Sequence, residues 1–270
     1  MISYQMSGTK ENVVLVIGCD SMIGRALSNA LHNDGYEVIK TSRRKPIAEG
    51  CFFLDLSERA SSYSLPENIS TAFFCAAETS SERCCANKDE THTVNVLQTR
   101  ILAKQIIAQG GRVIFLSTNR VYDGSKPYYK AQELPNPSIE YGKQKAQTEE
   151  SFLALGKNVV IVRLTKVLSD QSPLIAKWIE ALKNSIAIHP YRDMIISPLP
   201  LAYVVNILSK LIDTEFSGIL QVSGAEDINY AQLAENIAAE LGVDKNLVQP
   251  VDSFASDSPV ATSGLNQQPR

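Results

Sequence analysis

Apolar residues occur along most of the chain in two patterns, short continuous runs and longer stretches with helical spacing. Continuous β-branched and aliphatic runs are typical of strands buried on both faces of a parallel sheet, and apolar spacings of three and four residues are typical of amphipathic helices. The runs predict strands over residues 13–17, 36–40, 51–54, 70–77, 112–116 and 158–164. The stretches between them predict helices that end near residues 35, 109 and 155. This alternation predicts an α/β fold, a Rossmann-like doubly wound parallel sheet.

The pattern changes near residue 172, where shorter elements begin. Helices are predicted over residues 173–183, 201–212 and 230–241, with extended pieces over 194–197 and 218–222. We expect these elements to form a small C-terminal substrate lobe over the crevice of the sheet. The predicted domains are a dinucleotide-binding domain over residues 12–165 and a lobe over 166–252, with an interleaved arrangement as the alternative. Residues 1–11 and 253–270 lack apolar periodicity and are predicted to be disordered.

A glycine turn joins the first predicted strand to the helix that follows it. Gly18 and Gly24 lie where backbone N–H groups and a helix N-terminus could meet a pyrophosphate. The usual three-glycine spacing would place another glycine at position 21 or 22, so a turn without a ligand is the alternative interpretation. We predict a dinucleotide site, with contacts from Gly18, Ser21, Met22, Ile23 and Gly24.

The second predicted strand ends in the sequence TSRR, where NAD enzymes of this fold usually carry an acidic residue. Arg43, with Arg44 beside it, could pair with a ribose 2'-phosphate, which predicts NADP(H) in preference to NAD(H). A solvated basic turn is the alternative. Further cofactor contacts are predicted at the ends of the next two strands, at Asp55, Leu56, Cys75, Ala76 and Ala77.

Tyr141 and Lys145 lie four residues apart in a predicted helix and therefore share one face. A nearby ammonium stabilises a phenolate and so lowers the pKa of the tyrosine, which would make Tyr141 a usable acid or base. This spacing also arises by chance in a chain with ten tyrosines. Thr118 and Asn119 follow a central strand, at the edge where open α/β sheets bind ligands.

Composition limits the function classes. The apolar content of 44% and the net charge of -3 are those of a globular protein with no general attraction to nucleic acid or anionic membranes. We recognise no signal peptide and no apolar span of membrane length, so a cytoplasmic protein is expected. Five cysteines without a C-x-x-C pair and three scattered histidines predict no metal site.

Several motifs together resemble one family. They are VIGCDSMIG, FFCAA, FLSTNRVYDG, ELPNPSIEYGKQKAQTEE and GILQVSGAEDINYAQLAENIAAELG. The chain resembles the extended short-chain dehydrogenase/reductase family and is most similar to its dTDP-4-dehydrorhamnose reductase branch. The resemblance implies that Thr118 hydrogen-bonds the reacting oxygen, that Tyr141 transfers its proton, and that Lys145 lowers the tyrosine pKa and binds the nicotinamide ribose. It also implies an NADPH-dependent reductase that acts on a keto group of a nucleotide-activated sugar, such as a 4-keto-6-deoxy sugar.

The resemblance has a departure and leaves alternatives open. Dehydratases of the family carry an Asp-Glu pair directly after the hydroxyl residue, where this chain has Asn119 and Arg120, so dehydration is not expected. Substrate contacts are predicted at Asn119, Arg163 and Trp178, with packing roles as the alternative for the last two. A sugar epimerase and a regulatory subunit that binds the cofactor without catalysis are the competing functions. A homodimer is one expected assembly.

Overall fold

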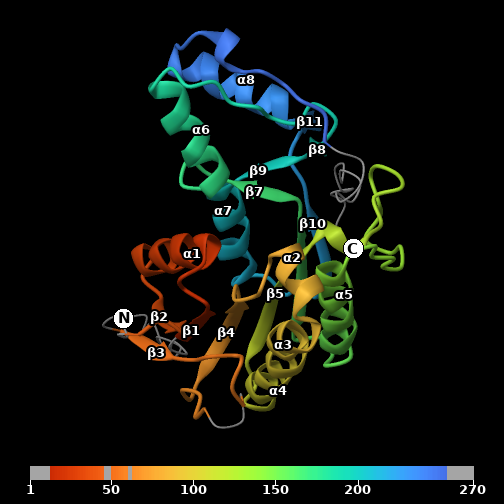
Figure 1. Cartoon of the computed structure of the whole chain (residues 1–270). Coiled ribbons are helices and arrows are strands. Elements are labelled where there is room, and N and C mark those ends of the chain that lie inside the picture. Colours follow the sequence, from red (N-terminus) through yellow and green to blue (C-terminus); the bar gives the residue numbers. More distant parts are fainter. Residues whose placement is uncertain (1–12, 46–49, 60–62, 254–270) are drawn as a thin grey trace, which may run out of the picture.

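The computed structural model describes residues 13–45, 50–59 and 63–253, and a single seven-stranded parallel sheet runs through its centre (Figure 1). The strands lie in the spatial order β3-β2-β1-β4-β5-β6-β10. Their bounds are β1 (Val13–Ile17), β2 (Glu37–Ser42), β3 (Cys51–Phe53), β4 (Ile69–Phe74), β5 (Arg112–Thr118), β6 (Val159–Leu164) and β10 (Gly218–Val222). The order reverses direction between β1 and β4, which is the switch point where ligands bind in this class of sheet. The predicted Rossmann-like fold is confirmed.

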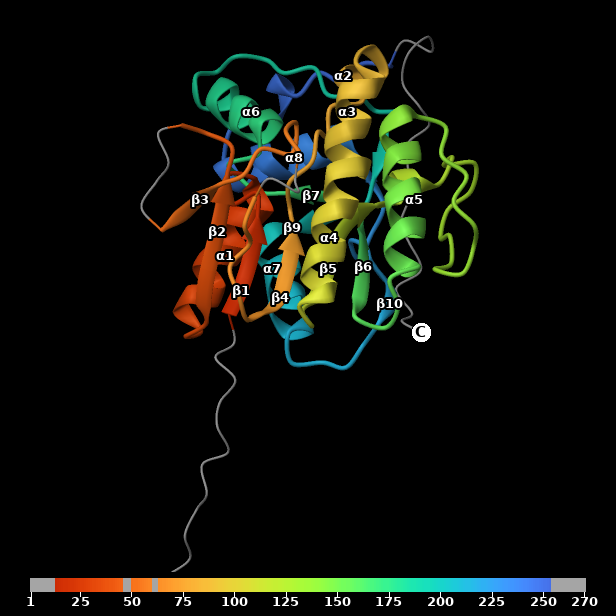
Figure 2. The ribbon, with the colours of Figure 1, turned by 90° about the horizontal axis from the view of Figure 1, so that it is seen from below.

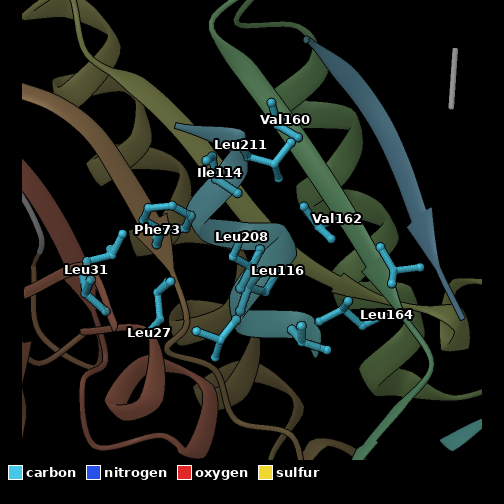
Figure 3. Packing of buried hydrophobic residues seen from close by; sticks show 14 of the residues in the cluster. Leu27, Leu31, Phe73, Ile114, Leu116, Val160, Val162, Leu164, Leu208 and Leu211 are labelled. Carbon is cyan, nitrogen blue, oxygen red and sulfur yellow. The ribbon is translucent and has the colours of Figure 1, made fainter. Parts of the chain in front are cut away.

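Helices cover both faces of the sheet (Figure 2). Helices α1 (Met22–Asn33) and α7 (Leu201–Leu211) pack on one face, and α4 (Thr99–Ala108) and α5 (Glu140–Leu153) pack on the other. Figure 3 shows the first interface, where leucines of α1 and α7 meet Phe73 and the aliphatic side chains of β5 and β6. The continuous apolar runs therefore form strands because both of their faces are buried.

The helix that was predicted to end near residue 109 contains a local irregularity. The short helix α2 (Ser81–Ala86) precedes it, and the segment itself consists of α3 (Lys88–His92), a π-helical turn (Thr93–Gln98) and α4. A π-helical turn redirects a backbone carbonyl that an α-helix would use internally. Here the carbonyl of Asn95 accepts a hydrogen bond of 2.9 Å from Thr148 Oγ1 on α5. The irregularity therefore joins two neighbouring helices.

A small lobe lies beyond the carboxyl end of β6 (Figure 1). Helices α6 (Pro173–Lys183) and α8 (Tyr230–Leu241) bury Ile175, Trp178 and Ala234 between them. Two pairs of short strands connect the lobe to the sheet domain: β7 (Lys166–Leu168) with β9 (Pro198–Pro200), and β8 (Ile195–Ile196) with β11 (Ile228–Asn229).

The two units are interleaved along the chain. After β9 the chain returns to the first unit, where α7 packs on the sheet and β10 pairs with β6. The predicted boundary at residue 165 therefore misplaces α7 and β10, whose apolar side chains are buried in the sheet domain. The predicted disordered ends over 1–11 and 254–270 lie outside the described residues. Ser253 is described, and its backbone N–H donates a hydrogen bond of 2.9 Å to Asp193, contrary to the prediction of disorder from residue 253.

Candidate active site

The glycine turn after β1 is closely packed. Gly18 has a φ of +87°, and a Cβ atom there would lie 2.7 Å from Ala76 at the end of β4. A Cβ on Gly24 would lie 2.3 Å from the carbonyl oxygen of Gly18. Ser21 caps α1, since its Oγ accepts a hydrogen bond of 3.0 Å from the N–H of Gly24. Both glycines are therefore required for the turn that presents the N-terminus of α1, although the third glycine of the usual spacing is absent.

A cavity of about 580 Å³ opens in front of this turn, and we call it the cofactor cavity. It extends from the turn across the carboxyl ends of β1, β2 and β4. The predicted cofactor residues that line it are Gly18, Ser21, Met22, Arg43, Asp55, Leu56, Cys75, Ala76 and Ala77. Gly24 lies behind the turn and supports it. The size of the cavity and the exposed glycine backbone fit a dinucleotide.

The cofactor cavity contains charges of both signs. Arg43 and Arg44 lie in it directly after β2, and the N–H of Arg44 donates a hydrogen bond of 2.9 Å to Ser42 Oγ. The same serine hydroxyl donates a hydrogen bond to the carboxylate of Asp20, which also lines the cavity. The sequence prediction did not include Asp20. Its carboxylate brings negative charge near the two arginines.

A second cavity, of about 400 Å³, adjoins the first, and we call it the substrate cavity. The two cavities share Met22, Cys75, Ala77 and Thr79. Besides the shared residues, the substrate cavity is lined by five further predicted site residues, namely Ile23, Thr118, Asn119, Tyr141 and Lys145. The structure therefore places the three predicted catalytic side chains, from β5 and α5, around a single cavity next to the cofactor cavity.

Lys145 is fixed below the substrate cavity. Its side chain is 3% exposed, and its Nζ donates a hydrogen bond of 2.7 Å to the carbonyl oxygen of Leu116 and lies 4.3 Å from the centre of the Phe115 ring. Burial lowers the pKa of Lys145 to about 8, and the carboxylate of Glu149 opposes this shift. The ammonium is therefore the main form at pH 7 and becomes the minor form a little above pH 8.

Tyr141 lies in the first turn of α5. Burial raises the pKa of its phenol, the nearby Cys84 raises it further, and the guanidinium of Arg120 lowers it. We predicted that Lys145 would lower this pKa, and the cation that has this effect in the structure is Arg120. Because burial dominates, the phenol is protonated at pH 7 and has a proton to donate, although the raised pKa makes it a weaker acid than a free tyrosine.

Asn95, a buried amide in the π-helical turn, connects the loop after β4 to helix α5. Its Oδ1 accepts a hydrogen bond of 2.8 Å from the N–H of Glu78, and its Nδ2 donates to the carbonyl oxygen of Glu78 at 3.0 Å and to Gln144 at 2.8 Å. These bonds attach the loop after β4, which lines both cavities, to helix α5.

Two predicted substrate residues do not line either cavity. Arg163 is 1% exposed and is held in the core of the sheet domain by a bidentate ion pair with Glu149, the shortest N–O distance being 2.6 Å. Trp178 packs inside the lobe with its ring edge against Tyr230. Both side chains therefore have the packing roles that were given as alternatives in the sequence analysis. Arg163 is paired with Glu149, and Trp178 packs against Tyr230.

The substrate cavity also contains residues that were not predicted as ligand contacts. They are Arg120 and Thr165 from the sheet domain and Lys166, Met194, Ile195, Ile196 and Tyr230 from the lobe. The lobe residues could not be placed from sequence, since only the tertiary arrangement brings them over β5. Arg120 could have been predicted as a ligand contact, because it stands at a position where the dehydratase motif has a glutamate.

Two kinds of feature are absent from the described part of the chain. No group of three or more His, Cys, Asp and Glu side chains within residues 13–45, 50–59 and 63–253 could hold a metal ion. In the same residues, none of the helices has the length and apolarity needed to cross a bilayer.

Comparisons with known proteins agree with this fold. Methionine adenosyltransferase 2 subunit beta of Xenopus tropicalis is 23% identical over 264 residues, which cover 92% of this chain and 77% of that protein. The crystal structure of dTDP-4-dehydrorhamnose reductase from Bacillus anthracis str. Ames in complex with NADP has a TM-score of 0.84 at 21% identity, covering 97% of this chain and 91% of that one. MoeE5 in complex with UDP-glucose and NAD has a TM-score of 0.80 at 23% identity, covering 94% and 89%. The family model described as RmlD substrate binding domain matches residues 12–263. The chain therefore belongs to the RmlD substrate binding domain family, within the extended short-chain dehydrogenases/reductases.

Proposed function

We propose that the protein is an NADPH-dependent reductase that acts on a keto group of a nucleotide-activated sugar, with Tyr141 as the proton donor. The observation that carries the proposal is the convergence of Thr118, Tyr141 and Lys145 on one cavity that adjoins the cofactor cavity. Two structural neighbours support the ligand classes, since one contains NADP and the other contains UDP-glucose.

The residues of the substrate cavity fit the reduction of a carbonyl group. A bound nicotinamide cofactor would supply the hydride. Thr118 would hydrogen-bond the carbonyl oxygen and hold it in place. The protonated phenol of Tyr141 would give its proton to that oxygen as negative charge develops there. The ammonium of Lys145, held by the carbonyl of Leu116, would keep a positive charge and a donor at the boundary between the two cavities.

The cofactor preference follows from the end of β2. Arg43 and Arg44 would pair with a ribose 2'-phosphate. The carboxylate of Asp20, which lines the same cavity, accepts a hydrogen bond from Ser42. We expect the Arg43→Ala variant to lose affinity for NADPH and to keep its affinity for NADH, because NADH has no 2'-phosphate. Equal losses for the two cofactors would contradict the preference for NADP.

The test of the reductase is the loss of NADPH absorbance with a panel of nucleotide keto-sugars. We expect Tyr141→Phe to lower turnover by about a hundredfold or more and to bind NADPH normally, since the variant lacks only the proton donor. Tyr203→Phe is the matched control, because Tyr203 is 45% exposed on α7 and lines neither cavity. Turnover by Tyr141→Phe at the rate of the control would overturn the mechanism.

A second candidate function is a regulatory subunit that binds the cofactor without catalysis. The likeness to methionine adenosyltransferase 2 subunit beta, over 92% of this chain, favours this candidate. A regulatory subunit would bind NADPH, would consume none with any keto-sugar, and would be unaffected by Tyr141→Phe. An epimerase would interconvert two sugars without net consumption of NADPH.

A further inference from the structure

The substrate cavity carries positive charge only. Its cationic lining residues are Arg120, Lys145 and Lys166, and none of its described lining residues is an aspartate or glutamate. The cofactor cavity differs, since its lining contains the carboxylates of Asp20, Asp55, Glu78 and Glu90 as well as arginines. Cations that line one cavity without a carboxylate repel one another, and a bound anion would reduce this repulsion.

Arg120 and Lys166 are the two cations of this group for which the described residues provide no hydrogen-bond or ion-pair partner. Within residues 13–45, 50–59 and 63–253, no side chain or carbonyl accepts a hydrogen bond from the guanidinium of Arg120. Lys145, in contrast, donates to the carbonyl of Leu116. Burial lowers the pKa of Arg120, and both burial and the charge of Arg120 lower the pKa of Lys166. Burial is the main cause of both pKa shifts, and the repulsion between the two cations adds to the shift of Lys166.

The backbone of Arg120 is fixed next to the reacting group. Its N–H donates a hydrogen bond of 3.1 Å to Thr118 Oγ1. Its carbonyl oxygen packs against Gly142, where a Cβ atom would lie only 2.1 Å away. Gly142 directly follows Tyr141, and the charge of Arg120 lowers the pKa of the Tyr141 phenol. The guanidinium is therefore presented to the substrate from the same short segment that presents Thr118.

This position indicates which part of a substrate would meet Arg120. In a nucleotide-activated sugar the diphosphate is attached to C1, on the opposite side of the ring from a keto group at C4. For a keto group at C4, an anion beside Tyr141 therefore belongs to the sugar and not to the diphosphate. A carboxylate at C6 satisfies this condition, and a guanidinium binds a carboxylate through two parallel hydrogen bonds.

We propose that Arg120, with Lys166 beside it, binds a carboxylate that the sugar carries next to its reacting carbon, so that the substrate is an acidic nucleotide sugar of the uronate type. This inference rests on the proposed function and makes it more specific. The family resemblance suggested a 6-deoxy sugar, which carries a methyl group at C6. The inferred substrate carries a carboxylate at that position. A methyl group could not accept a hydrogen bond from the Arg120 guanidinium.

The experiment measures binding to the full-length protein saturated with NADP⁺. The probes are two pairs that differ only at C6: UDP-glucuronic acid with UDP-glucose, and dTDP-glucuronic acid with dTDP-glucose. Within at least one pair we expect the acid to bind roughly tenfold tighter or more, as for a charge-assisted hydrogen bond. In Arg120→Gln the affinity for the acid should fall roughly tenfold more than the affinity for the neutral sugar. Lys177→Gln, which removes an exposed charge on α6, is the control and should keep the preference.

Each other outcome overturns the inference in a distinguishable way. If wild-type protein binds both members of a pair equally, the sugar is not acidic, and the proposed reductase survives. If Arg120→Gln weakens both members equally, the arginine binds the diphosphate. If no nucleotide sugar binds while NADP⁺ does, the proposed function fails and the inference fails with it. Retained NADP⁺ binding and an unchanged melting temperature show that each variant is folded.

Discussion

Lys145 illustrates at the scale of one residue how function and stability conflict. Its folded pKa of about 8 is lower than the ordinary value of 10.5, because the charged form is buried. The unfolded chain therefore binds more protons between these two values, so the contribution of Lys145 to stability rises with pH across this window. Below pH 8 the buried charge reduces stability by up to roughly 3 kcal/mol, and the hydrogen bond to Leu116 offsets about 1 kcal/mol of this cost.

We predict that Lys145→Met is more stable than wild type at pH 7 and has little activity. The gain in the free energy of unfolding, about 2 kcal/mol at pH 7, should shrink as the pH rises from 8 to 10. Wild-type turnover should fall over the same range, because the ammonium is lost. Urea unfolding at several pH values measures the first effect and NADPH consumption measures the second. Lys143→Met, at an exposed position of the same helix, should show neither. A loss of stability at pH 7 in Lys145→Met would contradict the prediction.

The individual residues also show how much of the site could be predicted from sequence. Thr118, Tyr141 and Lys145 were found because their positions follow from one strand end and one helical spacing. Arg163 was assigned to the substrate because its partner Glu149 comes from another element and is not recognisable from local sequence. Arg120 was seen only as a departure from a motif. What separates the two arginines is whether a carboxylate faces them, and this depends on tertiary structure.

At the scale of elements, the ion pair between Arg163 on β6 and Glu149 on α5 joins a strand to the helix that carries Tyr141. Ser117 and Tyr122 add hydrogen bonds to the pair, and Arg163 also donates to the carbonyl of Ala131. The mutual attraction of a buried ion pair adds little to the free energy of unfolding. Removal of one partner costs much more, because the other charge is then buried without a partner. The pair therefore fixes the position of α5 on the sheet.

We predict that Arg163→Met lowers the free energy of unfolding by about 3–5 kcal/mol, because Glu149 would remain as an unpaired buried charge. The double variant Arg163→Met with Glu149→Leu should recover most of this loss. The control is Arg192→Met, which breaks the exposed pair of Arg192 with Asp252 at the same N–O distance of 2.6 Å and should cost less than about 1 kcal/mol. Denaturant unfolding of the four proteins provides the comparison. Equal losses in the single and double variants would show that the charge left alone is not the cause.

Most elements were predicted within a few residues, because each has a buried face with a clear period. The exceptions have causes outside their own sequence. The π-helical turn at Thr93–Gln98 forms where Thr148 of another helix takes up a carbonyl. Strand β10 was recognised, but its place beside β6 depends on pairing that no local pattern records.

At the scale of the whole molecule, the sheet domain is completed only by a segment that follows the first part of the lobe. Helix α7 contributes Val204, Leu208 and Leu211 to the core on the face that it shares with α1, and β10 pairs over its full length with β6. A chain that ends before these elements would expose a hydrophobic sheet face and an unpaired strand edge.

We predict that a fragment of residues 12–165 does not fold and that a fragment of residues 12–253 does. The shorter fragment should aggregate or lack a cooperative thermal transition, since the sheet loses the cover of α7. Soluble yield and near-ultraviolet circular dichroism distinguish the two fragments. A cooperative transition in the shorter fragment would show that its fold does not need α7 and β10.

The interleaving has a mechanical consequence. The chain passes between the sheet domain and the lobe three times, and these passages meet around Gly224. The N–H of Gly224 donates a hydrogen bond of 3.4 Å to Thr165 Oγ1 in the first passage, and a Cβ on Gly224 would lie 2.4 Å from the carbonyl of Pro198 in the second. Three tethers gathered at one point act as a single pivot. We therefore expect the lobe, with Tyr230 and Lys166, to move about this point toward or away from Arg120, and a ligand that contacts both walls of the substrate cavity would restrict this motion.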